Sequence, residues 1–188
     1  MRQSAISYFA DPVLSLLSAA GLAIFALFYT DGTGGPGVPA WLLAVVAGGA
    51  LWTLVEYLVH RVIYHRVPIF MRYHMAHHAE PKAYVGAPPG LATCVIFLAS
   101  FAPLAPFAPM LANGVSAGML LGYMCYSLVH YGFHVATPAR GTYLYRAWLH
   151  HSVHHYRDGK GNFGVTTSFW DRVCGTRIER PGSRPRRW

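Results

Sequence analysis

Histidine is the residue type in this chain whose number and spacing could do chemistry. The eleven histidines occur in four groups, and none lies before residue 60. Two segments have the pattern H-x-x-H-H, in which the three rings stand at positions i, i+3 and i+4 and share one face of a helix. These triplets are His74, His77, His78 and His151, His154, His155.

Two further pairs of histidines flank the triplets in the sequence. His130 and His134 are four residues apart and are expected on the last turns of one helix. His60 and His65 are five apart, about 140° around an α-helix, so we expect them to serve two neighbouring metal ions. The helices that carry these pairs are predicted to run in the same direction, which places all four groups together.

Imidazole nitrogens are good ligands for zinc, copper, iron and nickel. Ten imidazole rings packed together without a metal ion would bury unpaired polar nitrogens and would repel one another when protonated. A structural zinc ion needs only four ligands, so ten predict two metal ions. Five nitrogens per ion would leave roughly one open position on each, which is what oxygen chemistry requires.

The composition limits the class of protein in which such a site could lie. The chain has 188 residues, of which 54% are apolar and 12% charged, with a formal net charge of +8. These values exclude a disordered chain and an ordinary nucleic-acid-binding protein. Three cysteines, Cys94, Cys125 and Cys174, imply no disulfide framework. We expect a single membrane-embedded domain over residues 1–188.

Long stretches without charge predict an all-α integral membrane protein. Four transmembrane helices are expected, with a turn at Asn113-Gly114 between the last two. The third is expected to be kinked or broken by Pro103, Pro106 and Pro109. The predicted spans are residues 12–30, 38–60, 90–111 and 114–135.

The positive charges predict the orientation of these spans. With the N-terminus inside, the outer loops near 31–37 and 112–114 contain no Lys or Arg. All 15 basic residues fall on the other side, as the positive-inside rule requires. The segments 60–82 and 136–176 then form a histidine-rich helical cap on the cytosolic side. The composition favours a bacterial inner membrane. For the first apolar stretch, the alternative to a transmembrane helix is a signal peptide.

The order H-x4-H, H-x2-H-H, H-x3-H, H-x2-H-H resembles the fatty acid hydroxylase/sterol desaturase superfamily, and most closely the catalytic domain of fatty acid 2-hydroxylases. The resemblance covers about residues 55–176. It includes Tyr123 to His134, the run from Gly141 to Tyr145, and G-N-F-G-V-T-T-S-F-W-D-R-V-C-G-T from Gly161 to Thr176.

This resemblance implies a centre of two iron ions that uses O2 to hydroxylate a lipid acyl chain, at the 2-position by analogy. Zinc can replace iron in purified protein. Electrons are expected from a separate cytochrome b5-like protein, ferredoxin or reductase, because no fused cytochrome b5 domain is expected here. The gap from His65 to His74 is shorter than in those enzymes. The implied metal ligands are His60, His65, His74, His77, His78, His130, His134, His151, His154 and His155.

Other residues are candidates for support of the metal ligands. Asp171 is expected either to accept a hydrogen bond from the outer N–H of a ligand histidine or to cap a helix or pair with Arg172 or Arg177. Glu56, one turn before His60, is expected to bind a histidine or an arginine. His150 is expected to be structural rather than a ligand. Tyr123, Tyr126 and Tyr131 are candidates for the acyl path or for packing.

Several alternatives remain open on the sequence. Carotenoid-ring hydroxylases share much of the histidine pattern but resemble H-x4-H at the third group, whereas His130 and His134 form H-x3-H. Desaturation of a lipid or sterol is possible on the same centre. The non-enzyme alternatives are a membrane metal-binding or transport protein, which should carry ionisable residues along the spans, and a haem protein, which should carry facing histidines within them.

Overall fold

The computed structural model describes residues 5–28, 37–82 and 88–178, with side chains from Phe9 onward. The prediction of an all-α protein is confirmed, since no strand occurs among these residues. The elements are α1 (Ala5–Phe28), α2 (Val38–Leu58), a π-helix η1 (Val59–Tyr64), α3 (Pro68–Ala79), α4 (Leu91–Phe101), α5 (Pro109–Val135), α6 (Tyr143–Tyr156) and α7 (Phe169–Val173).

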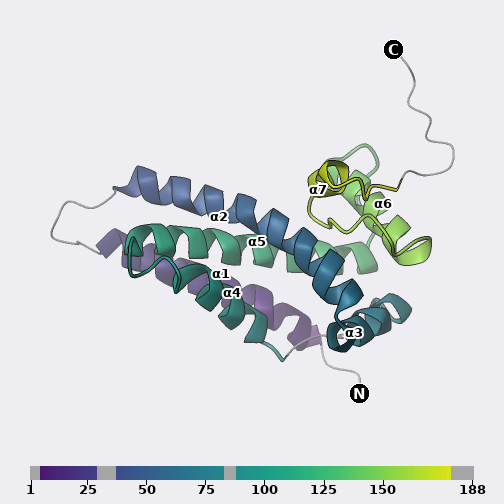
Figure 1. Cartoon of the computed structure of the whole chain (residues 1–188), viewed down its shortest axis with the longest axis horizontal. Helices are drawn as coiled ribbons and strands as arrows, with labels where there is room; N and C mark the ends of the chain where they lie inside the picture. Colours follow the sequence, from purple (N-terminus) through teal and green to yellow (C-terminus); the bar gives the residue numbers. More distant parts are fainter. Residues whose placement is uncertain (1–4, 29–36, 83–87, 179–188) are drawn as a thin grey trace, which may run out of the picture.

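Helix α5 is the central element of the bundle. It packs against α2, α1 and α4, and its first half is almost entirely buried (Figure 1). The helices α3, α6 and α7 gather at the end of the bundle where α2 and α5 finish. All four histidine groups therefore lie at one end of the molecule.

Glycines bring the backbones of α2 and α5 unusually close. A Cβ atom added to Gly118 of α5 would lie 2.0 Å from the carbonyl oxygen of Val45 on α2. A Cβ on Gly48 of α2 would lie 2.2 Å from the carbonyl oxygen of Val115. Small residues at such spacing allow close packing of membrane helices, where apolar side chains alone give little preference for one partner. This contact fixes α2 against α5. It therefore also fixes the position of the pair His60 and His65 relative to the pair His130 and His134.

The prediction of a turn at Asn113-Gly114 is wrong, because both residues lie inside α5. The side-chain oxygen of Asn113 accepts a hydrogen bond of 2.8 Å from the indole N–H of Trp41 on α2. A Cβ on Gly114 would lie 2.7 Å from that of Ala44. Asn-Gly is typical of turns, but here its glycine allows close packing of α5 against α2. The side chain of its asparagine is hydrogen-bonded to the other helix.

The chain instead reverses direction over residues 102–108, where the prolines stand. Helix α4 ends at Phe101, and α5 begins at Pro109, a position that proline favours because no helical N–H is required there. The helix predicted over 90–111 is thus broken, as the prolines indicated, and only 11 residues of it form α4. Such a helix is about 16 Å long and cannot cross a bilayer core of about 30 Å alone.

Among the residues that the structure describes, two helical segments are long and apolar enough to cross a membrane by length and composition. These are Phe9–Phe28 and Val38–Tyr64, each with a mean hydropathy of 1.9. Their apolar side chains face outward: Leu27 is 68% exposed and Leu43 70% exposed. The core helix of a soluble protein would bury such residues, so a lipid environment accounts for them better. The structure therefore indicates a membrane protein.

Replacing Gly118 by alanine tests the contact between α2 and α5. We expect Gly118→Ala to destabilise the fold by about 1–3 kcal/mol, since the added methyl group meets the backbone of α2. Gly132→Ala, in the same helix, is the matched control, because its added Cβ would meet no described atom within 4 Å beyond its chain neighbours and the backbone of its own helix. Thermal unfolding in detergent measures both, and equal stability of the two variants would contradict the packing account.

Candidate metal centre

The first histidine group comes from three elements. His60 and His65 come from η1 and its end, His74 and His78 from α3, and His154 from α6. The ligand atoms of these five side chains all lie within 4.8 Å of one another. The group is therefore compact enough to hold a single metal ion.

The second histidine group lies beside the first. It consists of His77 from α3, His130 and His134 from α5, and His155 from α6, again within 4.8 Å of one another. The Nε2 atom of His151 lies 3.3 Å from that of His134, at the edge of this group. Each H-x-x-H-H triplet is thus divided between the two groups, so α3 and α6 connect them.

The π-helix η1 places His60 and His65 in the same group. On an α-helix, residues five apart point about 140° from each other. A π-helix closes its hydrogen bonds over five residues instead, so residues i and i+5 stand on one face. Their ring centroids are 5.3 Å apart. The expectation that these two histidines serve different ions is therefore wrong.

Short distances between Nε2 atoms indicate that the rings point at common centres. His60 and His78 each lie 3.0 Å from the Nε2 atom of His74. In the second group, His77 and His134 lie 3.1 and 3.2 Å from His130. Two nitrogens at about 2.1 Å from one ion and at a right angle to each other are about 3.0 Å apart. The observed spacing is that of adjacent ligands.

Backbone carbonyls fix the ring orientation of two histidines. The Nδ1–H of His60 donates to the carbonyl of Phe163, and that of His154 donates to the carbonyl of Gly161 at 2.8 Å. A neutral imidazole that donates through Nδ1 has an unprotonated Nε2 with a lone pair. Both lone pairs therefore face the first group, which is the arrangement that a metal ligand requires.

Burial keeps the histidine rings neutral. It also leaves some ring nitrogens without a hydrogen-bond partner, and a metal ion would satisfy such nitrogens. Burial and neighbouring rings lower the pKa of His65 to about 4, and burial lowers the pKa of His77 to about 3. Both ring nitrogens of His155 are buried without a hydrogen-bond partner among the described residues. Unpaired buried nitrogens cost about 1–3 kcal/mol each. The donor set thus fits two transition-metal ions.

Asp171 supports the histidine cluster through the backbone. Its two oxygens accept hydrogen bonds from the N–H groups of Phe163 and Gly164, from Thr176 and from His150. Burial would raise the pKa of this carboxyl, but the hydrogen bonds outweigh it and hold the pKa below its usual value. The side chain is fully buried, and its histidine partner is His150 rather than a member of either group. Among the described residues its carboxylate forms no salt bridge with Arg172 or Arg177 and no hydrogen bond with a member of either histidine group, and Arg177 contacts Asp171 only through a backbone hydrogen bond.

Glu56 has a different role from either one expected. Its carboxylate accepts hydrogen bonds from the N–H of Val165 at 2.6 Å and from the N–H and hydroxyl of Thr166. It contacts neither a histidine nor an arginine through a hydrogen bond within the described part of the chain. Glu56 and Asp171 therefore hold the same loop from two sides, and this loop carries the carbonyl of Phe163.

The loop before α7 contains further residues that sequence reasoning did not single out. Asn162 adopts a left-handed conformation with φ of 57°, and its side chain bridges the backbone of His150 and Ile178. A Cβ on Gly164 would lie 2.0 Å from the carbonyl oxygen of Thr167. These residues belong to the run from Gly161 to Thr176. The glycines of that run were the sequence feature that could have indicated a tight backbone here.

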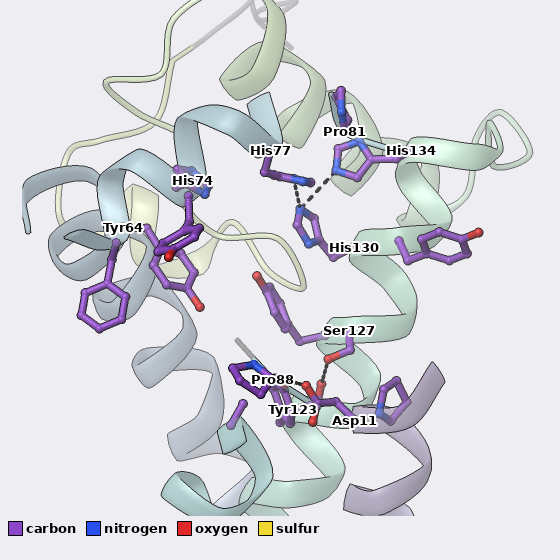
Figure 2. A pocket seen from close by; sticks show the side chains of 16 residues that line it. Asp11, Tyr64, His74, His77, Pro81, Pro88, Tyr123, Ser127, His130 and His134 are labelled. Atoms are coloured by element: carbon purple, nitrogen blue, oxygen red, sulfur yellow. Dashed lines mark hydrogen bonds between the residues drawn. The ribbon is translucent and has the colours of Figure 1, made fainter. Parts of the chain in front are cut away.

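A cavity of about 360 Å³ leads to the histidines (Figure 2). Histidines of both groups line one end, and Asp11, Pro88 and Tyr123 line the other (Figure 2). Tyr126 and Tyr131 also line the cavity, so the three tyrosines that were candidates for a substrate path all border it. Its walls are mainly aromatic and apolar, as ligand pockets usually are.

Comparison with known proteins agrees with this geometry. The sequence model of the family described as fatty acid hydroxylase matches residues 45–176. This match runs from within α2 to just beyond α7 and includes every histidine.

The chain belongs to the fatty acid hydroxylase family.

Individual relatives have names that describe acyl hydroxylases. The chain is 36% identical over 146 residues to the fatty acid 2-hydroxylase of Rattus norvegicus, a match that covers 71% of this chain and 39% of that protein. It is 32% identical to a dihydroceramide fatty acyl 2-hydroxylase of Arabidopsis thaliana, which covers 70% of this chain and 60% of that one. The chain thus spans about two fifths of the length of the mammalian relatives it matches.

A solved structure shares the fold of this hydroxylase family member. It is full-length scs7p, in which only the hydroxylase domain is visible, with a TM-score of 0.76 and 26% identity. The similarity covers 92% of this chain and 67% of that one. The helical arrangement around the histidines is therefore shared with this hydroxylase domain.

Removing the charge of Asp171 tests how this member of the hydroxylase family supports its candidate metal site. We expect Asp171→Asn to weaken metal binding about 10- to 100-fold, because an amide cannot accept all four hydrogen bonds and the loop under His60 loosens. Metal affinity is measured by competition with a chelator. Asp158→Asn, whose carboxylate accepts from the N–H of Lys160 in the same loop region and contacts neither Phe163 nor Gly164, is the control. Equal affinities of both variants would contradict this role.

Proposed function

We propose that this protein is an O2-dependent hydroxylase that inserts one oxygen atom into a lipid acyl chain. The observation that carries the proposal is the cavity of about 360 Å³, which joins histidines of both groups to aromatic and apolar walls. Family membership and the names of the relatives support the same reaction. They also favour the 2-position, the carbon next to the carbonyl, as the site of attack.

The ten histidines would hold two iron ions, one in each group, with His151 as the fifth ligand of the second. A pair of iron ions so held supplies the activation of O2 and the attack on an unactivated C–H bond. One oxygen atom enters the lipid and the other leaves as water, which consumes two electrons and two protons. A separate redox protein, such as a cytochrome b5-like protein, a ferredoxin or a reductase, would supply the electrons.

The residues of the chain position the substrate and exclude water. Tyr126 and Tyr131 border the cavity and would contact the acyl chain, so that its reacting carbon lies against His77 and His130 at the histidine end. Aromatic walls keep bulk water from the reacting end, which limits side reactions of activated oxygen. The carboxylates of Glu56 and Asp171 contribute by keeping the loop under His60 rigid.

We further propose how the protein lies in a membrane. Helices α1, α2 and α5 would cross the bilayer, and α4, whose Leu98 is 60% exposed, would be embedded beside them as the fourth membrane helix. Helices α3, α6 and α7 then form the cap on the cytosolic side, where the basic residues lie. A bacterial inner membrane is the expected location.

Lipid mass spectrometry tests the proposed reaction. A host that expresses the wild type should accumulate acyl lipids heavier by one oxygen atom, and a host that expresses His77→Ala should not. The reason is that His77 belongs to the second group and lines the cavity. Iron content of the purified proteins is measured beside it.

Two comparisons make this test specific. Met75→Leu, a change on the same helix at a side chain that is 42% exposed and does not line the cavity, is the control for expression and folding and should give the heavier lipid. Unchanged lipids in the wild type, despite bound iron and a supplied electron donor, would contradict the proposal, and carotenoids would be the next substrate class to assay.

A further inference from the structure

A continuous series of aromatic contacts leads from the second histidine group into the bundle. The ring of Tyr126 is stacked on His130, with centroids 5.4 Å apart and planes 19° apart. Tyr123, one turn earlier on α5, is stacked on Tyr126 at 6.3 Å. The indole of Trp52 on α2 contacts both tyrosines, at 5.3 and 6.0 Å. Rings at these distances are close enough for an electron to pass between neighbours.

The tyrosine at the far end of this series has an acceptor for its proton. The hydroxyl of Tyr123 donates to Oδ2 of Asp11 at 3.1 Å, within the reach that proton transfer requires. The other oxygen of Asp11 accepts from the N–H of Gly90 at 2.6 Å, and the side chain is only 8% exposed. Figure 2 shows Asp11 and Tyr123 together at the end of the cavity away from the histidines.

We propose that Tyr126 and Tyr123 form a redox relay that returns an electron to the metal centre when O2 has oxidised it with no lipid bound. This inference rests on the proposed function, which supplies the oxidant. One electron leaves Tyr123 and reaches the centre through Tyr126 and His130. The phenolic proton moves from Tyr123 to Oδ2 of Asp11. The products are a neutral tyrosyl radical at Tyr123, a protonated Asp11, and a centre reduced by one electron.

The hydrogen bond to Asp11 determines where the radical resides. Oxidation of a phenol in a dry site leaves a cation unless its proton has an acceptor, and a buried cation without a partner is costly. Among the described residues, the hydroxyl of Tyr126 has no carboxylate partner. The ring of Tyr64 is stacked on His74 at 5.3 Å, but no carboxylate accepts from its hydroxyl there either. Tyr123 is therefore the stable end of the relay.

The position of the relay gives it a protective use. Tyr123 and Tyr126 line the cavity that the acyl chain would occupy. With a lipid in place, its C–H bond is the nearest source of an electron and a hydrogen atom. With the cavity empty, the centre would otherwise oxidise the histidines that hold it. Electrons drawn from Tyr123 spare these ligands, and the external electron donor later reduces the radical.

Electron paramagnetic resonance of iron-loaded, reduced protein mixed with O2 in the absence of lipid tests the relay. The wild type should give a tyrosyl radical whose spectrum changes when the protein contains ring-deuterated tyrosine. Tyr123→Phe should lose this signal, and Asp11→Asn should lose it as well, because the proton acceptor is gone. Tyr73→Phe, another phenol that lines the cavity, should keep it.

The outcomes separate the relay from the proposed function. Iron content is measured in every variant, so that a loss of signal is compared only between proteins with equal iron. A wild type that hydroxylates lipid but forms no radical, or a radical that persists in Tyr123→Phe, would overturn the relay alone. A wild type that neither consumes O2 nor hydroxylates lipid would overturn both. Addition of lipid should suppress the radical.

Discussion

The mutual approach of ten imidazole rings is the constraint on which the rest of the structure depends. Their Nε2 atoms meet at distances near those of adjacent metal ligands, such as 3.0 Å between His60 and His74. Two lone pairs that face each other repel at that distance, and protonated rings would repel more strongly. A proton can be shared between only two of these nitrogens at a time, whereas a bound cation would be favourable for the whole group. The fold must therefore bring four helical elements together and hold them against this repulsion whenever no metal is bound.

Two features outside the cluster provide that support. Close contact at Gly48 and Gly118 fixes α2 against α5, which sets the distance between His60 and His130. Glu56 and Asp171 together hold one loop, whose Phe163 carbonyl orients His60. Neither carboxylate contacts a ring of the two groups. The acidic residues of the site thus act on the histidines through the backbone, and this leaves the cluster itself uniformly basic.

The sequence predicted the parts of this protein that depend on periodicity. Spacing of three and four residues placed the H-x-x-H-H triplets and His130 with His134 on helices, and α3, α5 and α6 confirm this. Prediction from the sequence failed where tertiary contacts determine the conformation of a local segment. The π-helix that unites His60 with His65 has no signature in spacing alone. Asn113-Gly114 has the composition of a turn, but the contact with Trp41 and Ala44 keeps it helical.

The partners of buried carboxylates were likewise beyond sequence reasoning. Glu56 was correctly singled out as a costly group near the membrane edge, yet its partners lie 109 and 110 residues away in the chain. Such long-range pairing follows from the packing of α7 beside α2, which no local pattern specifies. The division of each triplet between two groups depends in the same way on how α3 and α6 face each other.

The central claim is that the two histidine groups hold one metal ion each. Anomalous X-ray diffraction at the iron edge, on crystals of protein produced with iron, tests it most directly. The account predicts two separate iron peaks, one within the group that contains His60 and one within the group that contains His130. A single peak, or iron bound elsewhere in the molecule, would contradict it.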